Sequence, residues 1–177
     1  AAVKAFGAPD ILVNNAGVCP VKMISDTSYE EWRRVMDINV GGVFLTSRAF
    51  LKACVANGKS GRIVNVVSQS AFNGSKNGKT HYAASKGAVV SFTISFAKEA
   101  APYGVAVNAV SPGMMFTDMT SESLSAPGAL ERYAASIPIG RLAETEEVAR
   151  AAVYLCSEAS AYMTGSILDI SGGISGR

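Results

Sequence analysis

The sequence predicts one α/β domain, residues 1–177, with a doubly wound, mainly parallel sheet that carries helices on both faces. Short apolar runs of strand length alternate with longer segments of helical periodicity, which is the pattern of parallel α/β sheets. The short runs lack polar–apolar alternation, as expected where helices cover both faces of a sheet. Hydrophobic residues make up 49% and charged residues 17% of the chain, which indicates a globular protein rather than a disordered one.

Four segments are predicted to be strands. Each is a run rich in Val, Ile, Leu or Ala, bounded by Gly, Pro, Asn or Ser residues that favour turns. The four runs cover residues 10–14, 62–67, 105–110 and 166–170. Because helical segments connect them, we expect the strands to be parallel, with their carboxyl ends at the same edge of the sheet.

Three long helices are predicted between these strands. Ser28, with Glu31 three residues later, forms a capping box that opens a helix over residues 28–57. A second helix spans roughly residues 82–101, and a third begins near Thr145. The sheet should therefore be covered by helices along most of its length.

Residues 114–136 are predicted to form a mobile lid over the substrate site. The segment follows a predicted strand end, is long, and is rich in Ser, Thr, Gly and Pro, with weaker periodicity than its neighbours. Long loops with these properties in a small domain are usually functional.

Charge, hydropathy and ligand pattern do not indicate nucleic acid, membrane or metal partners. The net charge is +2 with no basic run, so no electrostatic stripe suggests nucleic acid. No apolar run approaches the ~20 residues that span a bilayer. Three cysteines at unrelated spacings and one histidine offer neither a disulfide framework nor a metal site, and favour a reducing cytoplasm.

Tyr82 and Lys86 are the first candidate catalytic pair. Residues four apart on a helix share a face, so the phenol and the ammonium should project together. A nearby cation favours the phenolate and would lower the pKa of Tyr82 from its reference of ~10 toward working pH. The phenol would then be a usable acid or base. Taken alone, a Tyr–Lys pair at this spacing is more often structural.

Ser68 is the candidate for holding a substrate oxygen. It sits at the end of the predicted strand 62–67, and parallel α/β sheets bind ligands outside the carboxyl ends of their strands. A hydroxyl there can donate to an oxygen as charge develops on it. Ser70 competes for this role two residues into the loop, and a serine at a strand end is more often a turn residue.

Taken in order along nearly the whole chain, these residues and several motifs resemble the short-chain dehydrogenase/reductase family. The similarity is greatest to bacterial 3-oxoacyl-carrier-protein reductases and polyol dehydrogenases. The matching positions are Asn14-Asn15-Ala16-Gly17, Asn39, Ser68, Tyr82, Lys86, Pro112-Gly113 and Thr117-Asp118.

The resemblance implies a Rossmann-like fold and an oxidoreductase that moves a hydride between a nicotinamide cofactor and a carbonyl or secondary alcohol. Tyr82 would be the acid or base, and Ser68 would hold the substrate oxygen. Lys86 would bias the pKa of Tyr82 and hold the nicotinamide ribose. Asn39, at a helix kink, would anchor a water for proton transfer. From the residues alone, Asn39 could equally satisfy a neighbouring backbone group.

The implied cofactor is NAD or NADP, and the implied substrate is a small molecule. The positions that the resemblance assigns to cofactor binding are Asn15, Ala16, Gly17, Tyr82, Lys86, Pro112, Gly113, Met115 and Thr117. His81, beside Tyr82, is expected to be solvated rather than functional.

The sequence departs from the family before Asn14. No Gly-rich turn that could cradle a pyrophosphate precedes it, so the sheet should lack its first strands and NAD cannot be told from NADP. Residues 1–6 read as the end of a helix, and strand 10–14 should lie at an exposed edge. If the chain acts alone, we expect weak cofactor binding and little turnover. The alternative is a non-catalytic fragment that serves as an oligomerisation or binding module.

A homo-oligomer, a tetramer or a dimer, is the predicted assembly. Residues 40–51 are apolar on nearly every side of their helix, and such a helix needs cover beyond its own sheet. A symmetric interface built from residues 40–51 and the helix 82–101 would supply that cover.

Overall fold

The computed structural model describes residues 2–75 and 77–175, which form a four-stranded parallel sheet in the order β1-β2-β3-β4. The strands are β1 (Ile11–Asn14), β2 (Gly61–Val66), β3 (Val105–Pro112) and β4 (Ile167–Ile170). The predicted α/β fold with a parallel sheet is confirmed. The strand ends differ from the prediction by one or two residues. The composition of an apolar run hardly changes when its end moves by one residue, so the sequence does not fix the exact end.

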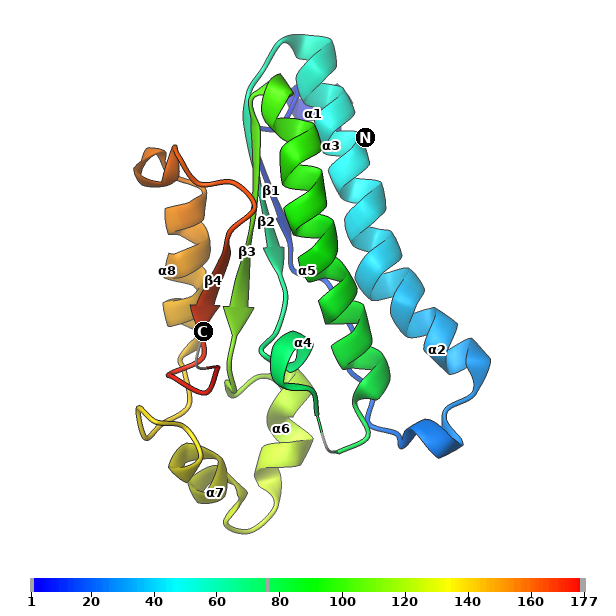
Figure 1. Ribbon diagram of the computed structural model, residues 1–177, viewed down its shortest axis with the longest axis vertical. Helices are drawn as coiled ribbons and strands as arrows, with labels where there is room; N and C mark the ends of the chain where they lie inside the picture. Colours follow the sequence, from blue (N-terminus) through cyan, green and yellow to red (C-terminus); the bar gives the residue numbers. More distant parts are fainter. Residues whose placement is uncertain (1, 76, 176–177) are drawn as a thin grey trace.

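Helices cover both faces of the sheet (Figure 1). On one face lie α3 (Gly42–Asn57) and α5 (Thr80–Ala100), and on the other lies α8 (Thr145–Leu155). The strands all point toward the end of the molecule where the short helices α4, α6 and α7 lie. This end is therefore where a parallel sheet offers its ligand site.

The remaining elements are short. They are α1 (Ala2–Phe6), η1 (Ile24–Asp26), α2 (Tyr29–Met36), η2 (Asp37–Gly41), α4 (Ser70–Asn73), η3 (Ala101–Tyr103), α6 (Asp118–Ser125), α7 (Ala129–Ala135) and η4 (Glu158–Ser160). Helix α1 agrees with the helix end predicted over residues 1–6, of which Ala1 lies outside the described residues. The predicted lid holds two helices, α6 and α7, because Thr117 starts α6 with a local capping box that the weak periodicity concealed. Its mobility stays a prediction.

The predicted helix over residues 28–57 is present, with a π-helical interruption. Ser28 and Glu31 form the expected capping box, with hydrogen bonds of 2.8 and 3.2 Å. Helix α2 then passes into the π-helical segment η2, which contains Asn39, and continues as α3. Such π-turns occur frequently at functional sites.

This continuous helix changes one expectation from the sequence. Among the described residues, the helix Tyr29–Asn57 is long and apolar enough to cross a membrane by length and composition, because it contains an 18-residue window with a mean hydropathy of 1.2. The expectation that no segment reaches this length was wrong, because the π-turn joins two helices without a break. Phe50 and Cys54 of α3 pack on the sheet, so the stretch is a helix of the α/β fold.

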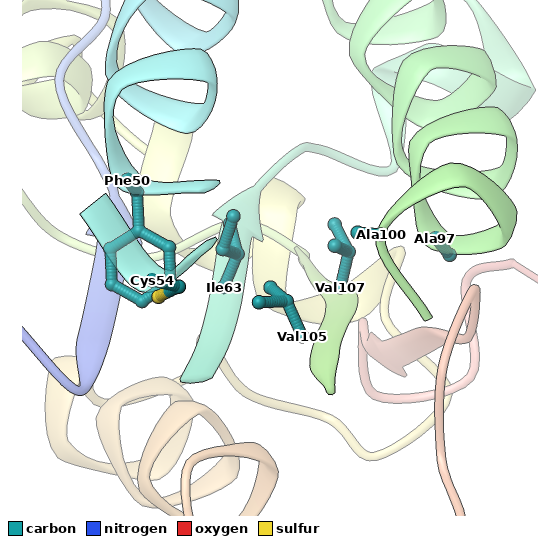
Figure 2. Packing of buried hydrophobic residues seen from close by; sticks show 7 residues of the cluster. All are labelled: Phe50, Cys54, Ile63, Ala97, Ala100, Val105 and Val107. Carbon is teal, nitrogen blue, oxygen red and sulfur yellow. The ribbon is translucent and has the colours of Figure 1, made fainter. Parts of the chain in front are cut away.

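A cluster of small and branched side chains joins α3 and α5 to the sheet (Figure 2). Its members, each at most 4% exposed, are Phe50, Cys54, Ile63, Ala97, Ala100, Val105 and Val107. The two alanines let α5 lie close to β3, and Gly61 makes room for Phe50, since a Cβ at Gly61 would stand 2.7 Å from the ring. In so dense a core, a change of one methyl group is felt.

A buried polar network crosses the same layer. Asn14 Nδ2 donates to Asn65 Oδ1 (2.8 Å) and to Ser47 Oγ (3.1 Å). Asn65 Nδ2 donates in turn to Thr93 Oγ1 at 2.9 Å. These bonds link β1, β2, α3 and α5 near the carboxyl ends of the first two strands, and thereby fix the helices relative to the sheet.

Strand β1 forms one edge of the described sheet and pairs with β2. Ile11 is 49% exposed and Val13 is 46% exposed. The expected exposed edge is confirmed, and an apolar strand edge of this kind favours association with another chain.

We expect Asn65→Ala to lower the free energy of unfolding by roughly 2–4 kcal/mol, because it leaves buried hydrogen-bond partners unsatisfied and opens a small cavity. Urea denaturation measures the change. Asn57→Ala removes an exposed amide that bonds Ala53 O on its own helix and should change stability by less than ~0.5 kcal/mol. Equal losses in the two variants would show that the network contributes nothing specific.

Candidate active site

A cavity of about 450 Å³ opens at the carboxyl ends of the strands. The loops after β1, β2 and β3, the start of α5 and the start of α6 line it. The predicted site residues that it brings together are Asn15, Ala16, Gly17, Ser68, Tyr82, Lys86, Pro112, Gly113, Met115 and Thr117. Asn39 does not line the cavity and lies buried behind it, 1% exposed.

Tyr82 and Lys86 lie on one face of the first turns of α5, and both line the cavity. The Lys86 ammonium is 6% exposed and donates to Val66 O at the end of β2, at 2.7 Å. It stands 5.8 Å from the centroid of the Tyr82 ring. The predicted projection of the two side chains into one site therefore agrees with the structure.

The expected lowering of the Tyr82 pKa was wrong for this arrangement. Burial raises the pKa of Tyr82 to about 12, although a hydrogen bond with Ser68 acts in the opposite direction. Lys86 is engaged with a backbone carbonyl rather than placed at the phenol oxygen. Spacing along a helix reveals that two groups share a face, but it does not reveal how much water surrounds them.

Burial also lowers the pKa of Lys86, to about 8. The described residues place no carboxylate within ion-pair distance of its ammonium. Desolvation thus favours the neutral form of both groups, the phenol of Tyr82 and the amine of Lys86.

Ser68 lies in the loop just after β2 and its Oγ accepts the Ser70 N–H at 3.2 Å. The hydroxyl therefore caps its own turn, and it also lies close enough to the Tyr82 phenol to favour its deprotonated form. Ser70 lines the same cavity, but its backbone serves to orient Ser68. The geometry favours Ser68 as the hydroxyl that works with Tyr82.

Asn39 uses its whole amide to join three segments. Its Oδ1 accepts the Val18 N–H at 2.8 Å, and its Nδ2 donates to Val18 O and to Ser85 Oγ, each at 2.9 Å. Ser85 Oγ donates to Tyr82 O at 2.7 Å. The side chain satisfies neighbouring backbone groups, as the alternative from the residues alone expected.

Gly17 allows this contact. A Cβ at Gly17 would stand 3.2 Å from Asn39 Oδ1, closer than that side chain accommodates easily, and at an ordinary contact distance of 3.6 Å from Lys86 Nζ. The loop after β1 can therefore lie against α5 because residue 17 has no side chain. The same lack of a side chain keeps that wall of the cavity open for a ligand.

The expectation for His81 was wrong. Its side chain is 1% exposed, and its Nδ1 has no hydrogen-bond partner among the described residues. The cause is packing at the start of α5, where α4 and α2 both contact this helix. A lone histidine in a polar stretch of sequence does not reveal that other helices will bury it.

The cavity includes residues that the sequence analysis did not single out. They are Cys19, Gln69, Lys79, Met119 and Thr120, apart from residues that only complete the walls. Lys79 stands three residues before Tyr82, a helical spacing that could have marked it. Cys19 follows the Asn-Asn-Ala-Gly loop by two residues, and no pattern distinguished it.

The cavity fits the nicotinamide end of a dinucleotide. It has walls without bulky side chains at Ala16, Gly17 and Gly113, and donors at Ser68 and Lys86. The described residues offer no Gly-rich turn for the pyrophosphate, since Gly172 packs on Ile137 and Ile139. This chain thus holds residues for one half of the cofactor.

The sequence matches, over residues 1–175, the family model described as enoyl-(acyl carrier protein) reductase. It is 40% identical to a 3-oxoacyl-[acyl-carrier-protein] reductase of Aquifex aeolicus over 93% of this chain and 65% of that protein. It is 41% identical to a galactitol 2-dehydrogenase (L-tagatose-forming) of Cereibacter sphaeroides, over 98% and 68% of the two chains. The chain therefore spans about two thirds of the length of such relatives.

Solved structures agree with this similarity. A gluconate 5-dehydrogenase of Burkholderia cenocepacia, in complex with NADP and tartrate, superposes with a TM-score of 0.94 at 30% identity, over 99% of this chain and 68% of that one. A short-chain type dehydrogenase/reductase of Mycobacterium marinum gives a TM-score of 0.90 at 38% identity, over 98% and 68%.

We expect Lys86 to contribute stability that grows between about pH 8 and pH 10, and Lys86→Met to remove that contribution. The unfolded lysine titrates near ~10.4 and the folded one near about 8, so between these values the unfolded state binds more protons. Linkage then gives a gain of roughly 3 kcal/mol toward high pH from this group.

The comparison is urea denaturation of wild type and variant at pH 7.5 and 9.5, with Lys52→Met, an exposed lysine on α3, as the control. The free energy of unfolding of wild type relative to that of Lys86→Met should increase from pH 7.5 to pH 9.5, and Lys52→Met should follow wild type. Parallel pH curves for all three proteins would contradict the depressed pKa.

Proposed function

This chain belongs to the short-chain dehydrogenase/reductase family, and from that premise we propose that it transfers a hydride between NAD or NADP and a carbonyl or secondary alcohol. The observation that carries the proposal is the convergence of Tyr82, Ser68 and Lys86 on one cavity at the carboxyl ends of the strands. When bound, the nicotinamide nucleotide supplies or accepts the hydride, and the protein supplies position and electrostatics.

In the reducing direction, Tyr82 gives its proton to the substrate oxygen as that oxygen gains negative charge. A pKa of about 12 keeps the phenol protonated at neutral pH, so the proton is present when it is needed. Ser68, which lines the same cavity as the phenol, holds the same oxygen. In oxidation, the phenol must first lose its proton, and a cation moved close to it would assist that loss.

Lys86 holds the nicotinamide ribose in this proposal, with its ammonium already placed in the cavity wall. Asn39 acts as a positioning residue, through Val18 and Ser85, and its anchoring of a water stays a prediction. The other residues that would hold the cofactor are Asn15, Ala16, Gly17, Tyr82, Pro112, Gly113, Met115 and Thr117.

Two relatives support a nicotinamide cofactor. The gluconate 5-dehydrogenase of Burkholderia cenocepacia binds NADP, and an L-rhamnose 1-dehydrogenase (NAD(P)(+)) of Azotobacter vinelandii is 38% identical to this chain. They leave either nucleotide open for this chain. The substrate in the proposal is a small carbonyl or alcohol, with residues 114–136 as its lid.

We further propose a homo-oligomer, tetramer or dimer, in the cytoplasm, without nucleic acid or membrane partners. Phe44 is 45%, Leu45 53% and Ile94 41% exposed on α3 and α5. This is the apolar surface that we expect another subunit to cover. The three cysteines are free thiols, as a reducing compartment allows.

Tyr82→Phe should lower kcat by at least about 10³-fold, because it removes the proton donor and little volume. Cofactor binding should stay within a few-fold of wild type. Steady-state turnover and nucleotide fluorescence titration separate the two effects. Tyr103→Phe, at the far end of α5 and 53% exposed, is the matched control and should behave as wild type.

Titration of mass-verified protein with NADH and with NADPH tests the proposal itself. Saturable binding of either nucleotide, followed by turnover that Tyr82→Phe abolishes, supports the oxidoreductase. A folded protein that binds neither nucleotide supports the alternative, a binding or oligomerisation module that retains the catalytic side chains without use.

Leu45→Glu should shift the assembly toward monomers, because a charge at an apolar interface must be desolvated. Sedimentation velocity at micromolar concentration measures the change. Leu130→Glu, on α7 and 48% exposed, introduces the same charge away from α3 and should leave the assembly unchanged. A monomeric wild type would contradict the proposed oligomer.

A further inference from the structure

Lys79 places a free cation at the wall of the catalytic cavity. It precedes α5 directly, three residues before Tyr82, and lines the cavity with it. Among residues 2–75 and 77–175, no carboxylate forms an ion pair with Lys79 and no acceptor takes a hydrogen bond from its ammonium. The residue is half-buried.

The local backbone adds to this positive potential. Helix α5 has 21 residues, its N-cap is Lys79 itself without a side-chain cap, and its first turn holds no acidic residue. The amino end of a helix carries a partial positive charge. At most helices an acidic or hydroxyl side chain offsets that charge, and here a lysine stands in its place.

Cys19 lines the cavity with Lys79 and responds to its charge. The ammonium groups of Lys79 and Lys86 both favour the thiolate of Cys19, although burial outweighs them and raises the thiol pKa. Cys19 also acts on Tyr82 and Lys86. Lys79 lines the same cavity as Cys19, Tyr82 and Lys86.

Asp118 is the carboxylate that shares the cavity wall. It is exposed, stands in the first turn of α6, and forms no ion pair with Lys79 in the described part of the chain. In that position it complements the amino end of its own helix. The cavity thus keeps unpaired positive charge next to Tyr82 and Ser68.

We infer that Lys79 binds a carboxylate of the substrate, so that the cavity selects an oxo acid or hydroxy acid over its neutral analogue. The inference rests on the proposed function and names its substrate class. A cation that lines the cavity without an ion pair can form a charge-assisted hydrogen bond with a carboxylate that enters it. A substrate whose carboxylate meets Lys79 has its reacting carbon held on the Tyr82 side, which is positioning as well as affinity.

The kinetic test compares short oxo acids with their methyl esters, which keep the shape and lose the charge. Wild type should prefer the acid by about tenfold or more in kcat/KM, the scale of one charge-assisted contact. Lys79→Gln should lower kcat/KM for the acid by a similar factor, mainly through KM, and leave the ester within about threefold. Lys98→Gln, an exposed lysine at the other end of α5, carries the same charge change as a control.

A second measurement needs no turnover. Iodoacetate and iodoacetamide alkylate Cys19 by the same displacement, in which the thiolate forms the C–S bond and iodide leaves, so their rate ratio reports the charge preference of the cavity alone. Mass spectrometry of the Cys19 peptide should give a ratio that falls at least about threefold in Lys79→Gln, and an unchanged ratio at Cys156.

The two tests separate the inference from the function on which it rests. Equal use of acid and ester by wild type, or equal losses for both in Lys79→Gln, would overturn the carboxylate site and leave the oxidoreductase intact. An alkylation ratio that does not depend on Lys79 would overturn it as well. Loss of all turnover with a Lys79-dependent ratio would remove the proposed function and keep the anion site.

Discussion

Three hydrogen bonds of one buried amide hold the site together. Asn39 accepts from and donates to the backbone of Val18, and donates to Ser85 on the helix that carries Tyr82. The loop after β1, the π-turn and the start of α5 can therefore move only as a unit. Because the amide has no spare donor, a loss at either end leaves a buried polar group unsatisfied. The position of the Tyr82 and Lys86 side chains over the strand ends depends on this junction, more than on contacts that the two residues make with each other.

Much of the fold and part of the site follow from local sequence patterns. The capping box of Ser28 and Glu31 and the turn-bounded apolar runs need no tertiary information, and these elements were predicted within a few residues. The shared face of Tyr82 and Lys86 is likewise a property of one helix. What could not be predicted depends on burial by distant elements. The Tyr82 pKa, the burial of His81 and the role of Lys79 all arise where loops from three strands meet.

The interior is apolar at one end of the sheet and polar at the other. Below the strand ends, Phe50, Ile63 and Val107 fill the space between helices and sheet without polar atoms. Toward the cavity, Asn14 and Asn65 replace them with a hydrogen-bonded network. The network orients the polar loops above it. Burial of the apolar side chains stabilises the fold and offsets the desolvation cost of burying these polar groups. The site is therefore supported by an asymmetric interior, apolar at one end of the sheet and polar at the other.

Exclusion of water explains the shifted pKa values of both Tyr82 and Lys86 in the cavity. The same burial raises the pKa of Tyr82 and lowers that of Lys86, so each group is driven toward its neutral form. The neutral phenol of Tyr82 can donate a proton. A pKa of about 8 lies only about one unit above neutral pH, so the Lys86 ammonium is easier to deprotonate than an ordinary lysine. Negative charge that enters the cavity, on a substrate oxygen or a bound anion, favours the charged form of Lys86 and opposes the effect of burial. Charge on the ligand and acidity of the site are thus coupled, because no carboxylate of the described chain has neutralised the lysines in advance.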